Sequence, residues 1–129
     1  MSINHVATSN SDCYTTAIAA GASEVEYMPG LPADGMGCIR TIQVESIDAN
    51  DWQVEILDAS SKVVGRVELP VADASVESVD GADHYFYSAS VELPVPNVQP
   101  FGVPVAVRNN SAVAKTEGAN LTVTIVASK

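Results

Sequence analysis

From Cys38 onward, apolar and polar residues alternate along most of the chain, as they do in strands that face a core on one side and water on the other. In the stretch CIRTIQVES, Ile42 and Val44 share one face. Gln43 and Glu45 share the opposite face. We therefore expect a strand that buries the first pair and exposes the second.

The segment from Asp51 to Leu69, DWQVEILDASSKVVGRVEL, predicts two strands joined by a polar turn. In its first half the apolar side chains share one face, and these are Trp52, Val54 and Ile56. Gln53 and Glu55 alternate with them and are expected to face water. Because Trp52 leads the apolar face, we predict that it anchors the core and does not serve as a ligand platform.

The turn of this hairpin is expected at Asp58–Ser61, because Asp and Ser side chains bond the local backbone and suit a four-residue loop. After it, one face carries Val63, Gly65, Val67 and Leu69, and the other carries Lys62, Arg66 and Glu68. Arg66 is then placed to meet Glu55 across the hairpin, an interaction worth about 0.2–1 kcal/mol.

The later segments extend the pattern. Residues 70–83 form an acidic connector, and HYFYSASVEL predicts a strand whose core face carries Tyr85, Tyr87, Ala89, Val91 and Leu93. The proline-rich run after it is expected to cross the surface, since proline cannot donate to a central ladder. VAVRN and LTVTIVAS are expected to close the fold as a pair of strands, the last with Leu121, Val123 and Ile125 toward the core.

The whole pattern predicts an all-β fold, a single antiparallel β-sandwich of either jelly-roll or immunoglobulin-like topology. Residues 1–36 are interrupted by Gly and Pro, although CYTTAIAA and EVEYM suit short strands. We expect residues 1–36 to be an extended N-terminal arm or edge segment, and residues 37–129 to be the sandwich domain. If the segment is an arm, its removal should leave the sandwich folded.

The net charge of the chain limits the kinds of partner that it can bind. The chain has 16 Asp and Glu against 6 Lys and Arg, a formal net charge of -10, with no Lys or Arg from Val67 to Val107. A phosphate backbone would be repelled by this field, so no nucleic acid is expected. No membrane partner is expected either, because the apolar runs are too short to span a bilayer. The first residues lack a secretory signal, which favours synthesis in the cytoplasm.

Candidate chemistry is sparse, and we expect a protein that is not an enzyme. No nucleophile elbow, P-loop or HExxH motif occurs. The histidines are His5 and His84, and His84 follows Asp83, which could orient its ring. We expect no catalytic, cofactor-binding or metal-binding residues. Cys13 and Cys38 match no zinc pattern and are expected to be free thiols, with a bridge between them as the alternative.

Two further patterns have both a functional and an ordinary structural explanation. The turns Asp48–Asp51 and Asp80–Asp83 offer oxygen ligands for calcium, but Asp, Asn and Gly are also what plain turns use, and we favour turns. The aromatic run His84–Tyr87, together with Trp52, could form a platform for sugar rings. With few aromatic residues in the chain, we expect most of these side chains to lie in the core.

The runs WQVEILDASSKVVGRVELP, YFYSASVELPVP and VPVAVRNNSAVAKTEGANLTVTIVAS resemble the small β-sandwich virion proteins of tailed bacteriophages, in particular capsid decoration, or cement, proteins. The resemblance extends from Cys38 to Ser128. It implies a homo-oligomer, with a trimer favoured, on the outer capsid surface, bound to the major capsid protein between capsomers. The alternative is a carbohydrate- or host-binding module of a tail or fibre.

Overall fold

The computed structural model describes residues 6–11, 18–28, 37–47, 49–96, 102–112 and 121–128. In these ranges the chain forms nine strands and one short 3-10 helix, η1, and no α-helix. The elements are β1 (Val6–Ser11), β2 (Ser23–Met28), β3 (Cys38–Ser46), β4 (Trp52–Leu57), β5 (Val63–Leu69), η1 (Val71–Asp73), β6 (Ser75–Val79), β7 (Ala82–Pro94), β8 (Val103–Asn109) and β9 (Leu121–Ser128). The prediction of an all-β fold is confirmed.

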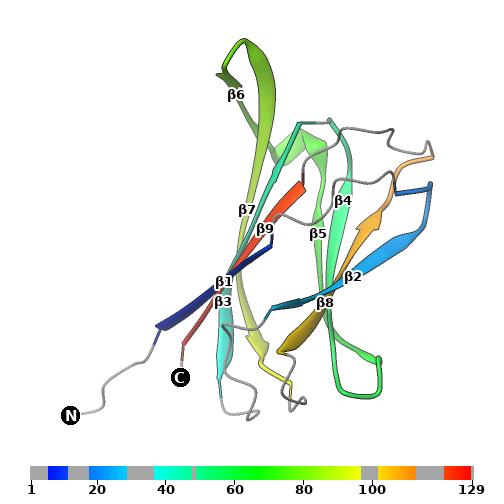
Figure 1. Ribbon diagram of the computed structural model, residues 1–129, viewed down its shortest axis with the longest axis vertical. Coiled ribbons are helices and arrows are strands. Elements are labelled where there is room, and N and C mark those ends of the chain that lie inside the picture. Colours follow the sequence, from blue (N-terminus) through cyan, green and yellow to red (C-terminus); the bar gives the residue numbers. More distant parts are fainter. Residues whose placement is uncertain are drawn as a thin grey trace.

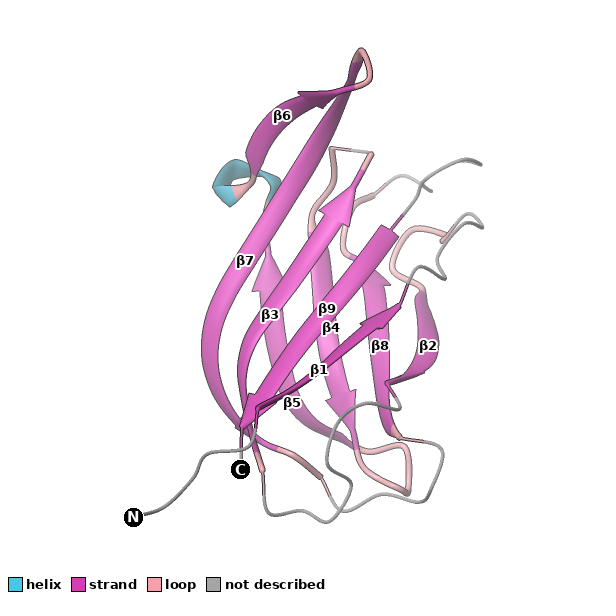
Figure 2. Cartoon of the chain, turned by 60° about the vertical axis from the view of Figure 1, so that its left-hand side comes forward, coloured by secondary structure: helices cyan, strands magenta, loops and turns pink. Residues whose placement is uncertain are grey.

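The strands form two antiparallel sheets that pack face to face (Figures 1 and 2). One has five strands in the order β1-β9-β3-β7-β6, and the other has four in the order β2-β8-β4-β5. The apolar faces of both sheets supply the core. The predicted antiparallel sandwich is therefore confirmed.

The strand order distinguishes between the two topologies that the sequence left open. When β6 is set aside, the pairs run from the outside of the chain inward: β1 with β9, β2 with β8, β3 with β7, and β4 with β5. This is one long hairpin of eight strands rolled up on itself. Such nesting defines the jelly roll. β6 is an additional strand inserted between β5 and β7.

The core follows the predicted alternation. Ile42 and Val44 on β3, and Trp52 on β4, are at most 2% exposed. The remaining members of the buried cluster are Ile18, Ile39, Val54, Ile56, Leu69, Tyr87, Val95, Val103, Val105, Val107, Val123, Ile125 and Ala127. Most are β-branched, which suits the thin layer between two pleated sheets. The predicted role of Trp52 as a core anchor is confirmed.

The prediction that Gln53 and Glu55 face water is wrong. Their exposed fractions are 6% and 7%, and every residue of β4 is buried. β4 is an inner strand between β8 and β5, so side chains on both neighbours shield its outer face. Arg66 lies opposite Glu55 and donates to its Oε2 atom from Nε and Nη2, at 3.3 and 3.0 Å. The predicted contact across the hairpin is thus confirmed.

The predicted turn at Asp58–Ser61 is confirmed, with the Ser61 N–H donating to the Asp58 carbonyl oxygen at 3.0 Å, but the loop between the paired Leu57 and Val63 has five residues and not the expected four. Asp58 Oδ1 accepts hydrogen bonds from the backbone N–H groups of Ser60 and Lys62, at 2.8 and 2.9 Å. Ser61 takes a positive φ of 63°. A bulge between Ile56 and Leu57 shifts the register after this turn, and Val63, expected on the core face, is 37% exposed.

The last two strands do not pair with each other as predicted. β8 pairs with β2 and β4, whereas β9 pairs with β1 and β3, so the two lie in opposite sheets. In a jelly roll, strands adjacent in sequence cross between sheets, which overrides the usual pairing of neighbours. The inward placement of Val123 and Ile125 is confirmed, because both are fully buried.

Part of the N-terminal segment belongs to the sandwich. β1 and β2 are the edge strands of the five- and four-stranded sheets. Ile18 is 3% exposed in the core. The described strands of residues 1–36 are thus paired with strands of the sandwich. EVEYM lies in β2, whereas most of CYTTAIAA lies outside the described residues. The division of the chain at residue 36 stays a prediction.

Candidate functional site

A groove of about 330 Å³ lies on the five-stranded sheet. Its lining includes one row of paired residues, Thr124, Gln43 and Ser88, from β9, β3 and β7. A second row consists of Glu45, Phe86 and Ser75, from β3, β7 and β6. On β3, β7 and β9 these residues alternate with the buried residues Val44, Tyr87 and Val123, so the groove, which we call the outer groove, lies on the face away from the core.

His84 lies beside this groove, and its partner is Glu45 and not Asp83, which the sequence suggested. Its Nδ1 atom lies 2.7 Å from Glu45 Oε2, across from β7 to β3, while the neighbouring Asp83 is exposed. The contact is an ion pair only when the imidazole is protonated. In the described residues, no hydroxyl or thiol donates to the other ring nitrogen, so the pair lacks the geometry of an activated nucleophile.

The imidazole also packs against Phe86. The two rings stack with centroids 6.3 Å apart and planes 24° from parallel. Glu45 therefore fixes His84, and His84 in turn fixes one side of Phe86. The three residues together therefore present the half-buried ring of Phe86 in a fixed orientation, surrounded by polar groups.

The predicted aromatic cluster divides between two faces. Trp52 and Tyr87 are 1% and 2% exposed and belong to the core, and Tyr85 packs against the core from its edge. Phe86 points to the opposite face of β7 and lines the outer groove. The sequence reading that most of these rings lie in the core is confirmed, and Phe86 lies on the face opposite Tyr85 and Tyr87, as the predicted alternation requires.

A second surface feature is the hairpin of β6 and β7, which projects beyond the end of the sandwich (Figures 1 and 2). The sequence suggested only an acidic connector for residues 70–83, and that description is wrong for β6. Asp80 and Gly81 both have positive φ, 52° and 83°, as a two-residue hairpin turn between paired Val79 and Ala82 requires. The prediction of a plain turn at Asp80 is thus confirmed.

The projecting hairpin is exposed, apolar in part, and acidic. All five residues of β6 are exposed, and Val76 is 55% exposed. Glu77, Asp80 and Asp83 lie on the same hairpin. Among the strands that the structure describes, β6 is also an edge strand, so one side of its backbone has no neighbouring strand in the sheet.

The other turn considered for calcium is used structurally where it is described. Asp51 Oδ1 accepts from the backbone N–H of Val71 at 2.9 Å, and Asn50 is 3% exposed within a hydrogen-bonded cluster. Asp48 lies outside the described residues. Across the part of the chain that the structure describes, no three His, Cys, Asp or Glu side chains gather as a metal site would require.

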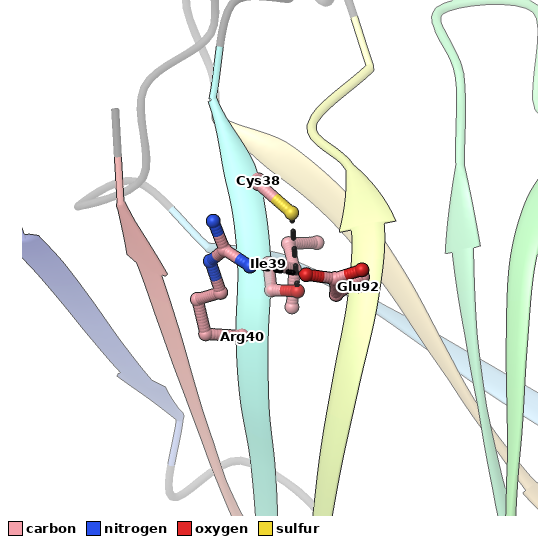
Figure 3. A network of polar contacts seen from close by, with 4 residues as sticks. All are labelled: Cys38, Ile39, Arg40 and Glu92. Atoms are coloured by element: carbon pink, nitrogen blue, oxygen red, sulfur yellow. Dashed lines mark hydrogen bonds and ion pairs between the residues drawn. The ribbon is translucent and has the colours of Figure 1, made fainter.

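Cys38 lies at the start of β3, where its half-buried thiol is free and approaches the carbonyl oxygen of Ile39 at 3.8 Å (Figure 3). Next to it, Arg40 reaches across to Glu92 on β7, with an Nη1–Oε1 distance of 2.7 Å (Figure 3). Cys13 and His5 lie outside the described residues. None of the helical residues described is part of a helix long enough to cross a membrane.

Comparisons with known proteins extend the result for the fold. No protein-family model matches the chain, and no curated protein matches its sequence. The structure is similar to that of the PRD1 vertex protein P5, with a TM-score of 0.50, 15% identity, and coverage of 96% of this chain and 95% of that chain. It is also similar to a structure of infectious bursal disease virus, Gx strain, with a TM-score of 0.51 and 8% identity.

The second match covers 98% of this chain but 33% of the viral chain, so nearly all of this chain corresponds to one part of the larger one. At these identities the comparisons establish a shared fold. The class of protein defined so far is a single jelly roll with a projecting hairpin and a polar outer groove.

Proposed function

We propose that this chain is a structural virion protein that binds the outer surface of a phage capsid and reinforces contacts between capsomers. The observation that carries the proposal is the match to the PRD1 vertex protein P5 over nearly the full length of both chains. A fold alone does not specify a function. The sequence resemblance to capsid decoration proteins supports the same role independently of the structural match.

The β6–β7 hairpin is the surface through which we propose that the protein attaches. The hairpin extends beyond the sandwich (Figure 1), and the apolar side chain of Val76 is exposed to water and could be buried against a partner. Since no Lys or Arg occurs from Val67 to Val107, the complementary surface should carry basic residues around an apolar pocket. The proposed partner is the major capsid protein.

Attachment to a lattice does not require a strong single contact. A homo-oligomer, for which we favour a trimer, would place several hairpins on adjacent capsid subunits, and linked contacts bind far more tightly than one. We propose that the protein is made in the host cytoplasm and acts in the assembled particle. Light scattering should give about three times the chain mass of 13.4 kDa if the trimer forms in solution.

The decisive experiment uses particles of the virus that encodes the chain. The purified particles should contain the protein at a fixed copy number, and particles lacking it should lose heat resistance and regain it when the purified protein is added. Absence of the protein from purified particles would overturn the proposal.

The hairpin is tested with a matched pair of valines. Val76→Ser should weaken binding to stripped particles, whereas Val64→Ser, which alters a valine that is 39% exposed on β5, should not. Equal effects of the two substitutions would remove the hairpin from the mechanism while leaving the virion role intact.

A further inference from the structure

We propose that the outer groove binds a neutral saccharide, with one pyranose ring stacked on Phe86 and its hydroxyls held by Gln43, Glu45 and Ser88. This is a second activity, separate from attachment to a capsid. It would use the face of the five-stranded sheet that points away from the core.

The first argument is the position of Phe86. It lies between Glu45 and Ser75 in one row of the sheet, with Gln43 and Ser88 in the neighbouring row. A large aromatic ring among polar groups on an outer face leaves apolar surface in contact with water, which is unfavourable. A pyranose ring presents apolar C–H groups on its flat side, so it can cover such a ring while its hydroxyls remain hydrogen bonded.

The second argument is the spacing of the polar groups. Neighbouring strands lie about 4.8 Å apart, and successive residues on one face of a strand are about 6.8 Å apart. Gln43 and Glu45 are such a pair on β3, and both lie one strand away from Phe86 or Ser88 on β7. An amide, a carboxylate and a hydroxyl are therefore distributed around the aromatic ring at the scale of a single sugar.

The third argument is preorganisation. Glu45 holds His84 at 2.7 Å, and His84 stacks on Phe86, so the ring is oriented before any ligand arrives. A site that is already ordered loses less conformational entropy on binding. The volume of about 330 Å³ falls at the lower end of the range for small-molecule sites, which suits a short saccharide.

Charge selects among saccharides. The groove lining contains Glu45 and neither Lys nor Arg, and the chain as a whole carries a formal net charge of -10. Sialylated, sulfated and phosphorylated sugars would be repelled by this field. The chemistry therefore fits hydroxyl-rich neutral sugars, which need polar partners of both kinds and no cation.

The test starts with the full chain on a glycan array that includes neutral oligomers of mannose, glucose, galactose and N-acetylglucosamine beside sialylated and sulfated glycans. Binding to at least one neutral oligomer is expected. No binding to any neutral glycan, or preferential binding to the acidic ones, would overturn the proposal.

Variants then locate the site by NMR titration with the methyl glycoside of the sugar bound. Phe86→Leu keeps an apolar side chain but removes the flat ring, and should weaken binding about tenfold or more. Gln43→Ala should weaken it without changing the fold. Val76→Ser, on the projecting hairpin, is the matched control and should bind normally. Unchanged affinity in both Phe86→Leu and Gln43→Ala would overturn the assignment to this groove.

Discussion

Tyr87 on β7 donates its hydroxyl hydrogen to the backbone carbonyl oxygen of Asn50, 2.6 Å away, in the segment that leads into β4. The same hydroxyl oxygen accepts from the Asn50 backbone N–H at 3.4 Å. Because β7 and β4 belong to opposite sheets, this contact joins the two layers at one end of the sandwich.

The contact belongs to a larger buried cluster. Asn50 Nδ2 donates to Asn109 Oδ1 at 3.1 Å, and Asn109 Nδ2 donates to the carbonyl oxygen of Ile18 at 2.9 Å. Asn109 closes the end of β8, and Ile18 precedes β2. Four segments distant in sequence thus meet through residues that are 3% exposed or less.

Tyr87→Phe should therefore destabilise the protein by about 1–3 kcal/mol, because the buried backbone groups of Asn50 lose a partner that water cannot replace. Denaturant unfolding gives the value. Tyr85→Phe is the control, since Tyr85 is half-buried on the same face of β7 and should change stability little. A loss no larger for Tyr87→Phe than for the control would contradict the role of the hydroxyl.

Two ion pairs show whether burial or distance has the larger effect on the strength of a salt bridge. Arg40–Glu92 is the shorter at 2.7 Å, but the side chains are 50% and 80% exposed. Glu55–Arg66 measures 3.0 Å, with the side chain of Glu55 only 9% exposed and that of Arg66 56% exposed. Solvent screening weakens the first pair, whereas an unpaired Glu55 would be a poorly solvated charge.

Double-mutant cycles should accordingly rank the two pairs by burial. The coupling energy of Arg40 with Glu92 is expected to be below about 1 kcal/mol, and that of Glu55 with Arg66 to exceed it, at about 1–2 kcal/mol. Suitable substitutions are Arg→Met and Glu→Gln, measured by urea unfolding. A stronger coupling for the shorter, exposed pair would show that distance and not burial sets the energy.

The sequence predicted features that depend on local alternation. Trp52, Val54 and Ile56 were assigned to the core because a strand places every second side chain on one face, and this holds wherever the strand lies. The burial of Gln53 and Glu55 could not be predicted in the same way. It depends on β4 being an inner strand between β8 and β5, which is a property of the sheet order.

Features that depend on pairing between segments distant in sequence could not be predicted from local patterns either. β8 and β9 were expected to pair because they are adjacent in sequence, yet the rolled hairpin sends them to opposite sheets. β6 was missed because it is exposed on both faces and shows no buried alternation, although Asp80 and Gly81 are a strong turn signal. The outer groove combines residues of β3, β6, β7 and β9, which no local pattern connects.

Trp52→Ala should destabilise the fold by about 3–5 kcal/mol, as expected when a large buried ring is removed from a core. Trp52→Phe is the milder control. The indole N–H has no hydrogen-bond partner in the described residues, so Phe should lose volume but no hydrogen bond. Thermal unfolding followed by circular dichroism measures both. A Trp52→Ala protein of normal stability that had lost saccharide binding would mean that Trp52 is part of a ligand site.

Gly81→Ala tests the projecting hairpin. Gly81 has a φ of +83°, and an added Cβ would meet nothing within 4 Å, so the change introduces backbone strain of about 1–2 kcal/mol without a clash. We expect faster amide exchange in β6 and little change in global stability, since β6 buries no residue. Gly65→Ala is the contrasting variant, because its Cβ would lie 3.0 Å from Leu93 Cδ1 in the sandwich itself. A global loss of stability in Gly81→Ala would mean that the hairpin is integral to the core.

Deletion of residues 1–36 separates the two descriptions of the N-terminal segment. An arm could be removed without unfolding the sandwich, but the described strands β1 and β2 cover the edges of β9 and β8. Ile18 fills part of the core, and its carbonyl oxygen accepts from Asn109. Removal of the segment would expose two unpaired strand edges and open one end of the buried cluster, and exposed edges promote aggregation.

We therefore expect residues 37–129 alone to be insoluble or to unfold without a cooperative transition, whereas a chain lacking only residues 1–5, which precede β1, should keep the stability of the full protein. Size-exclusion chromatography and thermal unfolding measure both. If residues 37–129 form a soluble domain with an unchanged unfolding temperature, then β1 and β2 contribute little to the sandwich, and the segment acts as the arm that the sequence allowed.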